Sequence, residues 1–166
     1  MGFHLAIKFP SFSNILLFRM PQSSAHTIPG RYASIGDACA FVVAGAEQAG
    51  FSVDELFRIE LACDEACTNI IEHAYGGENV GEIRITWRIE ANTFTITMVD
   101  DGPPFDPDDV PPPEVPGDKS DLNGLKIGGL GIYFMRNLMD EVQFTRDEHQ
   151  GNTLVMVKYR SSNESK

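Results

Sequence analysis

The hydrophobic residues of this chain follow two different periods, and this change of period constrains the fold most. Residues 34–49 and 54–75 carry apolar residues at helical spacing. Residues 83–89 and 94–98 instead alternate apolar and polar residues around a short turn at Ala91-Asn92, which is typical of a hairpin with one buried face. Two amphipathic helices followed by a half-buried hairpin indicate helices packed on an antiparallel sheet.

Short signals predict where these elements begin and end. Gly50 stops the first helix, Ser52 and Glu55 form a capping box for the second, and Gly76-Gly77 ends it. Residues 127–139 return to helical spacing, and residues 141–146 and 152–159 read as a closing antiparallel strand pair. The predicted fold is therefore α+β, a two-layer α/β sandwich with helices on one face of a mostly antiparallel sheet.

We expect one domain over residues 27–160, because 166 residues suit a single core. Residues 1–26 are expected to form an N-terminal tail or an added edge strand, and residues 161–166 a disordered tail. The many prolines of a loop at about 103–127 exclude a regular element, and acids fill the spaces between them. We interpret this loop as a lid, because a loop this long inside a compact domain is usually functional. The prolines of the loop are Pro103, Pro104, Pro107, Pro111, Pro112, Pro113 and Pro116.

Charge and cysteine content exclude several classes of protein. The chain has 13 basic and 24 acidic residues, a formal charge of −11, which disfavours direct nucleic-acid binding and a membrane-surface role. Three cysteines, without the spacing of a disulfide framework, favour a reducing compartment and hence a cytoplasmic protein. Cys63 and Cys67 have the i, i+4 spacing of a metal pair, but Cys63 belongs to the apolar stripe and a buried structural role is favoured.

One polar stripe runs beside the apolar stripe of the second predicted helix. It contains Glu65, Asn69, Glu72 and His73. A carboxylate can accept a proton there, and the Asn69 amide can offer a neutral oxygen to a hard cation. The alternative is a solvated helix face, which this spacing alone does not exclude.

Three further segments have the composition of a nucleotide site. Asp100 and Gly102 end a strand, where an acid can accept from an exocyclic amine and a glycine admits a flat ligand. Glycines of the stretch 128–131 precede a helix, whose N-terminus suits phosphate. Thr153 lies between the last two strands and could hold a base or an ordered water. Taken singly, each also fits an ordinary turn or close packing.

Together and in this order, the four segments resemble the anti-sigma factor serine kinases, a branch of the Bergerat-fold ATPases to which histidine kinases also belong. The matching stretches cover roughly residues 27–160, and they are ELACDEACTNIIEHAYGG, VDDGPPFDP, GGLGIYFMRNLMDEV and GNTLVMV. The wider superfamily has a second glycine where this chain has Pro104, a departure that favours the anti-sigma branch.

The resemblance implies a role for each matching residue. Glu65 would be the general base, Asn69 the Mg²⁺ ligand and His73 a neighbour of the phosphates. Asp100 would accept from the adenine amine. The remaining residues implied to bind ATP are Gly102 beside the base, Gly129, Leu130 and Gly131 along the phosphate path, and Thr153 in the adenine-side network. Positive charge near the phosphates could come from a basic side chain, and the sequence does not decide between Lys119, Lys126 and Arg136.

The implied function is an ATP- and Mg²⁺-dependent serine/threonine-protein kinase and anti-sigma regulatory factor. Its substrate would be an anti-anti-sigma antagonist, a sigma factor would be a second partner, and the chain would form a homodimer. Arg31 resembles a position that contacts the protein partner, with an ordinary surface arginine as the alternative. The alternative function is a non-enzymatic switch that binds ATP or ADP and exchanges partners without phosphoryl transfer.

Overall fold

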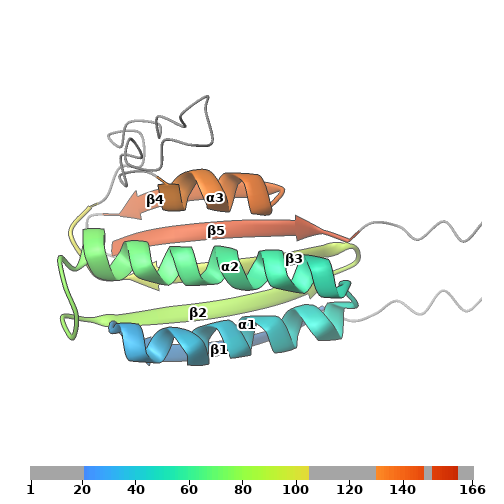
Figure 1. Ribbon diagram of the computed structural model, residues 1–166, viewed down its shortest axis with the longest axis horizontal. Helices are drawn as coiled ribbons and strands as arrows, with labels where there is room; N and C mark the ends of the chain where they lie inside the picture. Colours follow the sequence, from blue (N-terminus) through green and yellow to red (C-terminus); the bar gives the residue numbers. More distant parts are fainter. Residues whose placement is uncertain (1–20, 105–129, 148–150, 161–166) are drawn as a thin grey trace, which may run out of the picture.

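The structure is a computed structural model that describes residues 21–104, 130–147 and 151–160, with the side chain of Asp147 left out. Figure 1 shows the arrangement of its helices and strands. In chain order these are β1 (Gln22–Pro29), a short 3₁₀ turn (Tyr32–Ser34), α1 (Ile35–Ala49), α2 (Val53–Asn69) with a π-helical extension (Ile70–Ala74), β2 (Glu82–Glu90), β3 (Thr93–Asp100), α3 (Leu130–Leu138), β4 (Glu141–Asp147) and β5 (Gly151–Tyr159).

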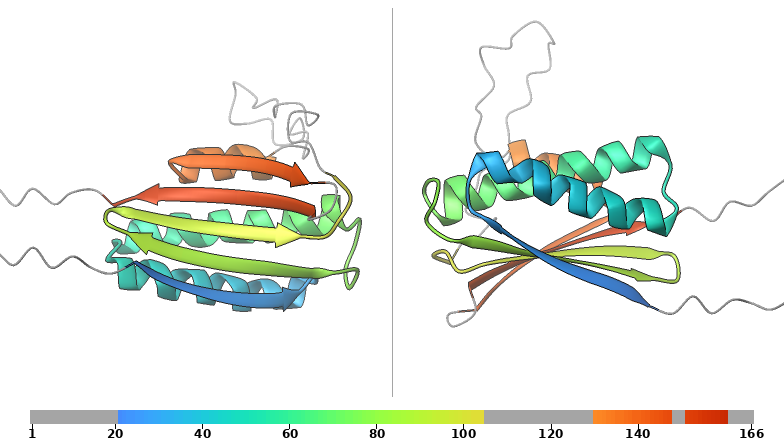
Figure 2. Two further views of the ribbon diagram at one scale, coloured as in Figure 1. Left: turned by 180° about the vertical axis from the view of Figure 1, so that it is seen from behind. Right: turned by 90° about the horizontal axis from the view of Figure 1, so that it is seen from below.

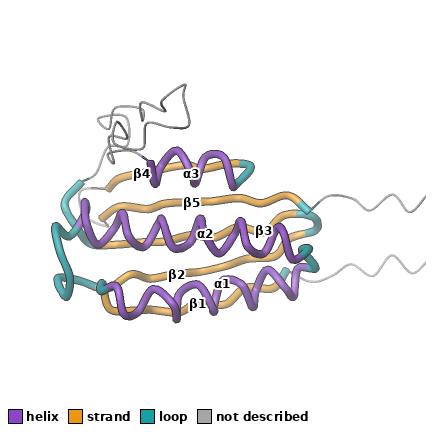
Figure 3. Tube along the Cα trace, in the orientation of Figure 1, coloured by secondary structure: helices purple, strands orange, loops and turns teal. Residues whose placement is uncertain are grey.

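The strands form one five-stranded sheet in the order β1-β2-β3-β5-β4, and every neighbouring pair is antiparallel. All three helices cover the same face of this sheet, and the opposite face is uncovered by any described element (Figure 2). Figure 3, in the orientation of Figure 1, colours helices and strands differently and shows the helices lying across the strands. The predicted two-layer α+β fold is therefore confirmed.

The first strand, β1, lies at the edge of the sheet. It pairs with β2 from Gln22↔Ile89 to Pro29↔Glu82, so residues 22–26 form part of an edge strand, one of the two expectations for the N-terminal segment. Most of its side chains are exposed, which explains why its sequence lacks the alternation of a half-buried strand. The predicted tail 161–166 and the predicted lid lie outside the described residues, except for Pro103 and Pro104.

The predicted helix boundaries are confirmed at the two long helices. Gly50 ends α1 with a φ of 88°, a left-handed conformation that glycine adopts without a steric penalty. At the start of α2, the backbone N–H of Glu55 donates to Ser52 Oγ at 3.4 Å, and the backbone N–H of Ser52 donates to Glu55 Oε2 at 2.8 Å. These reciprocal bonds satisfy two of the donors that a helix N-terminus leaves free.

The core lies between the helices and the sheet. Every second residue of β2 and β3 is buried against α1 and α2, whereas the alternate residues face outward and are mostly threonine, arginine or glutamate. All three cysteines are buried and free, so they pack as small apolar side chains between the helices. No helix in the described ranges is long and apolar enough to cross a membrane.

Gly45 allows α1 to approach the sheet closely. A Cβ at this position would lie 2.7 Å from two ring carbons of Trp87 and 2.8 Å from Nε1. The Trp87 ring is buried and packs between Phe41 and Phe94, with centroid separations of 6.1 Å and 6.3 Å. The ring therefore has little room to move away, and the residue at position 45 sets the distance between helix and sheet.

We predict that Gly45→Ala destabilises the fold by about 1–3 kcal/mol, the usual cost of overpacking a filled core. Gly36→Ala is the matched control on the same helix, because a Cβ at Gly36 meets nothing within 4 Å. The control should be neutral or slightly stabilised, since alanine favours a helix over glycine. Urea unfolding followed by circular dichroism measures both changes. Equal stability of the two variants would contradict this account of the α1–sheet contact.

Candidate functional site

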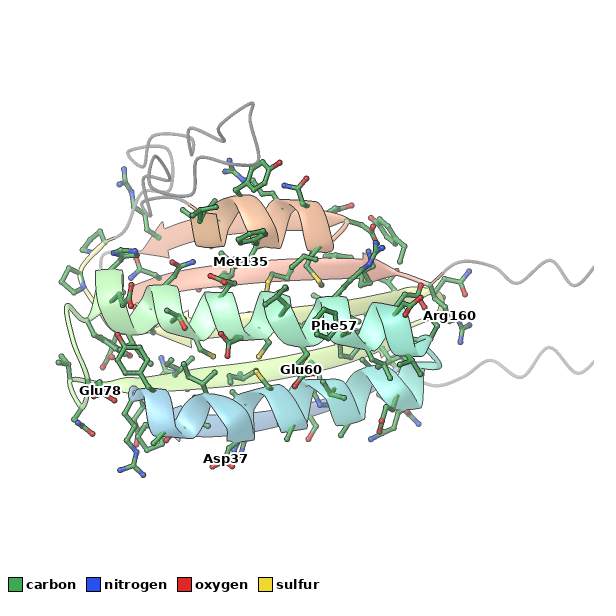
Figure 4. The ribbon with its side chains drawn as sticks, viewed as in Figure 1. Asp37, Phe57, Glu60, Glu78, Met135 and Arg160 are labelled. Carbon is green, nitrogen blue, oxygen red and sulfur yellow. The ribbon has the colours of Figure 1, made fainter. Side chains whose placement is uncertain are left out.

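A narrow pocket lies between α2, α3 and the strands β3, β5 and β4. Its volume is about 30 Å³, and it reaches from Asn69 on α2 to Asp100 at the end of β3. Met135 lies on the side of α3 that faces α2 (Figure 4), and it forms part of the pocket wall together with Phe144 of β4. The pocket therefore joins three of the four segments that the sequence singled out: the polar stripe of α2, the Asp100 strand end and the segment that contains Thr153.

Glu65 and Asn69 meet the start of α3. They stand one turn apart on α2, and Gly131 of α3 packs directly against both. A Cβ on Gly131 would lie 2.7 Å from Asn69 Nδ2 and 2.8 Å from Glu65 Oε2. Only glycine fits this position without displacing the two polar groups, so Gly131 and the polar stripe of α2 lie in direct contact.

Burial raises the pKa of Glu65 above its ordinary value. Loss of solvent is the main cause, and the negative charges of Asp64 and Glu72 add to it. A carboxylate with a raised pKa is a stronger proton acceptor than a free glutamate.

Asn69 carries a polar atom without a partner. Its Nδ2 is buried, and within the described residues it makes no hydrogen bond. Buried amides are normally paired, so an unpaired one points to a ligand. Rotation of the amide exchanges its nitrogen and oxygen, which would present an oxygen to a cation. No group of three His, Cys, Asp or Glu in the described ranges could hold a metal alone, so Asn69 fits Mg²⁺ only together with ligands such as phosphate oxygens.

Asp100 is held by two donors at the other end of the pocket. The Gly102 backbone N–H and the Asn152 Nδ2 group each donate to its Oδ1 at 2.9 Å, so neither bond uses Oδ2. Burial raises the pKa of this carboxyl, whereas the Asn152 and Gly102 bonds oppose the rise. The arrangement fixes the carboxylate in one orientation, with its second oxygen available to an exocyclic amine.

Asn152 was missed by the sequence reasoning, which selected its neighbour Thr153. Asn152 is buried, pairs with Asp100 across the β3–β5 ladder, and also donates to the Pro103 carbonyl at 2.9 Å. Thr153 borders the pocket, but the hydrogen bond to Asp100 comes from Asn152. Asn152, Leu154 and Met156 alternate inward along β5, so the period of two could have placed Asn152 on the core side.

Tyr75 is a second residue that the sequence reasoning missed. Its hydroxyl donates to the Glu82 carbonyl at 2.6 Å and to Asp101 Oδ1 at 3.0 Å. The ring also fills the space beside Gly81, where a Cβ would lie 2.6 Å from it. Tyr75 thereby ties the end of the α2 extension to the strand end that carries Asp100, and burial raises its pKa.

Four other residues that the sequence singled out do not line the pocket. Gly102 packs against the end of the α2 extension, where a Cβ would lie 2.7 Å from the Ala74 carbonyl oxygen. His73 is exposed in that extension, and Leu130 is half-buried at the start of α3. Arg31 is exposed, and its Nε donates to Ser34 Oγ at 3.1 Å.

The last of the predicted residues are one glycine and three basic residues. Gly129 lies outside the described residues, as do Lys119 and Lys126. Arg136 is exposed in the last turn of α3. Of the glycine-rich stretch and the helix that follows it, the structure describes Leu130 onward.

Known proteins resemble this chain in sequence. The sequence model of the histidine kinase-like ATPase domain matches residues 28–158. The serine-protein kinases RsbW of Bacillus thuringiensis (strain Al Hakam) and of Bacillus anthracis are each 39% identical over 115 residues, which is 69% of this chain and 70% of each relative.

Among solved structures, the catalytic domain of the histidine kinase ThkA matches with a TM-score of 0.47 and 15% identity. That match covers 82% of this chain and 96% of the ThkA domain. The residues matched by the family model include Asn69 and Asp100, which line the pocket, and Glu65, which lies beside Gly131. The chain therefore belongs to the histidine kinase-like ATPase domain family and, within it, to the serine-protein kinases of the RsbW type.

Proposed function

We propose that this serine/threonine-protein kinase transfers the γ-phosphoryl group of Mg-ATP to a hydroxyl of an anti-anti-sigma antagonist protein. We further propose that it acts as an anti-sigma regulatory factor that sequesters a sigma factor. The observation that carries the proposal is the contact of Gly131 with both Glu65 and Asn69 at one end of the pocket whose other end is Asp100.

The Asp100 end of the pocket suits the adenine of ATP, and the Asn69 end suits its phosphates. The Asp100 carboxylate, through Oδ2, would accept a hydrogen bond from the adenine amine, with Gly102 beside the base. Asn69 would hold Mg²⁺ together with phosphate oxygens, and Leu130, Gly131 and the preceding Gly129 would line the phosphate path at the α3 N-terminus. Bound Mg²⁺ would neutralise part of the phosphate charge, which an acidic chain otherwise repels.

Glu65 would accept the proton of the substrate hydroxyl. As the hydroxyl oxygen bonds to the γ-phosphorus, the bond between that phosphorus and the β,γ-bridging oxygen breaks and ADP leaves. Little covalent chemistry falls to the protein, so its contribution is position and electrostatics. The raised pKa of Glu65 supports its role as proton acceptor.

The base-binding end must widen before a nucleotide enters. A volume of about 30 Å³ holds a water-sized group and not a purine. Met135 and Phe144 border this space, and methionine rearranges at low cost because its side chain is unbranched. We propose that these two side chains move apart when adenine binds beside Asp100.

Further parts of the proposal follow from the family resemblance. Thr153 would support the adenine-side network from β5, and His73 would lie near the phosphates. Arg31, on the exposed turn before α1, would contact the antagonist. The kinase would work as a homodimer in the cytoplasm, without direct contact to nucleic acid.

We expect Glu65→Gln to retain Mg-ATP binding and to lower phosphoryl transfer at least about a hundredfold, because the hydroxyl proton loses its acceptor. Transfer of labelled phosphate from ATP to the purified antagonist measures the loss. Glu60→Gln is the matched control, since this exposed glutamate of α2 points away from the pocket (Figure 4). Full activity of Glu65→Gln would refute the role of Glu65, and absence of transfer by the wild type would favour the non-enzymatic switch.

Asp100→Asn should reduce the preference for adenine over guanine nucleotides, because an amide presents a donor as well as an acceptor to the base. Calorimetric titration with Mg-ADP and Mg-GDP measures the ratio of the two affinities. An unchanged ratio would place the base-binding end elsewhere in the molecule.

Asn152→Ala should weaken Mg-ADP binding about tenfold, because the Asp100 carboxylate loses a buried hydrogen bond and its fixed orientation. Thr153→Val is the neighbouring control on β5. A larger loss of Mg-ADP affinity in Thr153→Val than in Asn152→Ala would contradict the role of Asn152 in holding Asp100.

A further inference from the structure

The outer sides of α1 and α2 enclose an open groove on the face away from the sheet. The groove has a volume of about 410 Å³. Its α1 wall is made of small residues, among them Gly36 and Ala40, and its α2 wall carries Phe57 and Leu61. Phe57 is 65% exposed, an unusual position for a phenylalanine within a helix. The groove is therefore shaped and composed to receive apolar side chains.

The groove also has an acidic edge. Glu60 and Asp64 line it from α2, on the same helix as Phe57. Figure 4 shows Phe57 and Glu60 on the side of α2 that faces away from the sheet. An occupant that combines apolar side chains with positive charge would complement both features.

The chain itself contains a segment of this composition. Residues 1–20 include two cationic side chains, Lys8 and Arg19, and no aspartate or glutamate, although the whole chain has a formal charge of −11. Nine large apolar residues lie in the same segment, and they are Phe3, Leu5, Ile7, Phe9, Phe12, Ile15, Leu16, Leu17 and Phe18. Large apolar side chains in this number normally have a partner that covers them.

The segment leaves the fold within reach of the groove. Gln22 pairs with Ile89 beside the β2–β3 turn, and Arg160 links that turn to α1 by donating to the carbonyl oxygens of Asn92 and Ala49. β1 therefore begins at the end of the molecule where α1 ends (Figure 1). Twenty extended residues span up to about 66 Å, whereas a helix of α1's length spans about 22 Å. The segment can therefore pass around α1 and run along the groove.

We propose that residues 1–20 bind in the α1–α2 groove of their own chain. Their apolar side chains cover Phe57 and Leu61, and their cationic side chains face Glu60 and Asp64. The groove lies on the outer side of α2, so this contact is separate from the nucleotide pocket and independent of the proposed kinase activity.

Limited trypsin digestion of the full chain tests this contact, because it reports how often the bond after Lys8 is free for cleavage. We expect Glu60→Lys and Phe57→Ser to accelerate this cleavage at least about tenfold over the wild type, since each removes charge or apolar complementarity. Asp37→Lys is the matched control, because Asp37 lies on the side of α1 away from α2 (Figure 4). The control should be cleaved at the wild-type rate.

Several outcomes would overturn the proposal. Equal cleavage rates in all four proteins would show that the groove does not hold the segment. Protection that rises with protein concentration would assign the groove to the segment of a second copy. Circular dichroism of each variant checks the fold, which substitutions at these exposed positions should leave intact.

Discussion

The packing of α2 across the sheet is the contact on which the rest of the structure depends. Its buried stripe, which includes Ile59, Cys63 and Ala66, is fully enclosed between the other helices and the strands. This burial fixes the rotation of the helix, and the neighbouring stripe with Glu65 and Asn69 is thereby turned toward α3 and the pocket. The packing of the apolar stripe of α2 therefore determines the position of the Glu65 and Asn69 side chains.

The polar groups of the pocket divide into two kinds. Asp100 and Asn152 satisfy one another in the core, so their hydrogen bonds contribute to the fold as well as to the site. In Asn69, by contrast, the buried Nδ2 has no hydrogen-bond partner among the described residues, and burial raises the pKa of Glu65. Both features cost free energy of folding, and such costs are common at the functional sites of proteins.

Local signals in the sequence predicted the elements better than the site. Gly50, the Ser52–Glu55 capping box and the alternation of β2 and β3 each act within a few residues, and the structure confirms them. The edge strand β1 was placed only loosely, because its exposed side chains carry no hydrophobic period. Asn69 and Asp100, two of the residues that the sequence singled out, line one pocket, and Glu65 lies beside Asn69 at Gly131; their roles remain predictions.

The missed residues depend on contacts between distant parts of the chain. Asn152 contacts Asp100 because β3 and β5 are paired. Tyr75 contacts Asp101 because the π-helical extension of α2 places its ring beside the end of β3. No local pattern in the sequence encodes these two contacts, although the inward alternation of β5 narrows the choice for Asn152.

A crystal structure of the protein with Mg²⁺ and a non-hydrolysable ATP analogue tests the central claim most directly. The account predicts the adenine amine within hydrogen-bond distance of Asp100, the metal ion bound by Asn69 and the γ-phosphate beside Glu65. It also predicts that Met135 and Phe144 move outward around the base. A nucleotide bound away from Asp100, or a metal ion held without Asn69, would contradict the account.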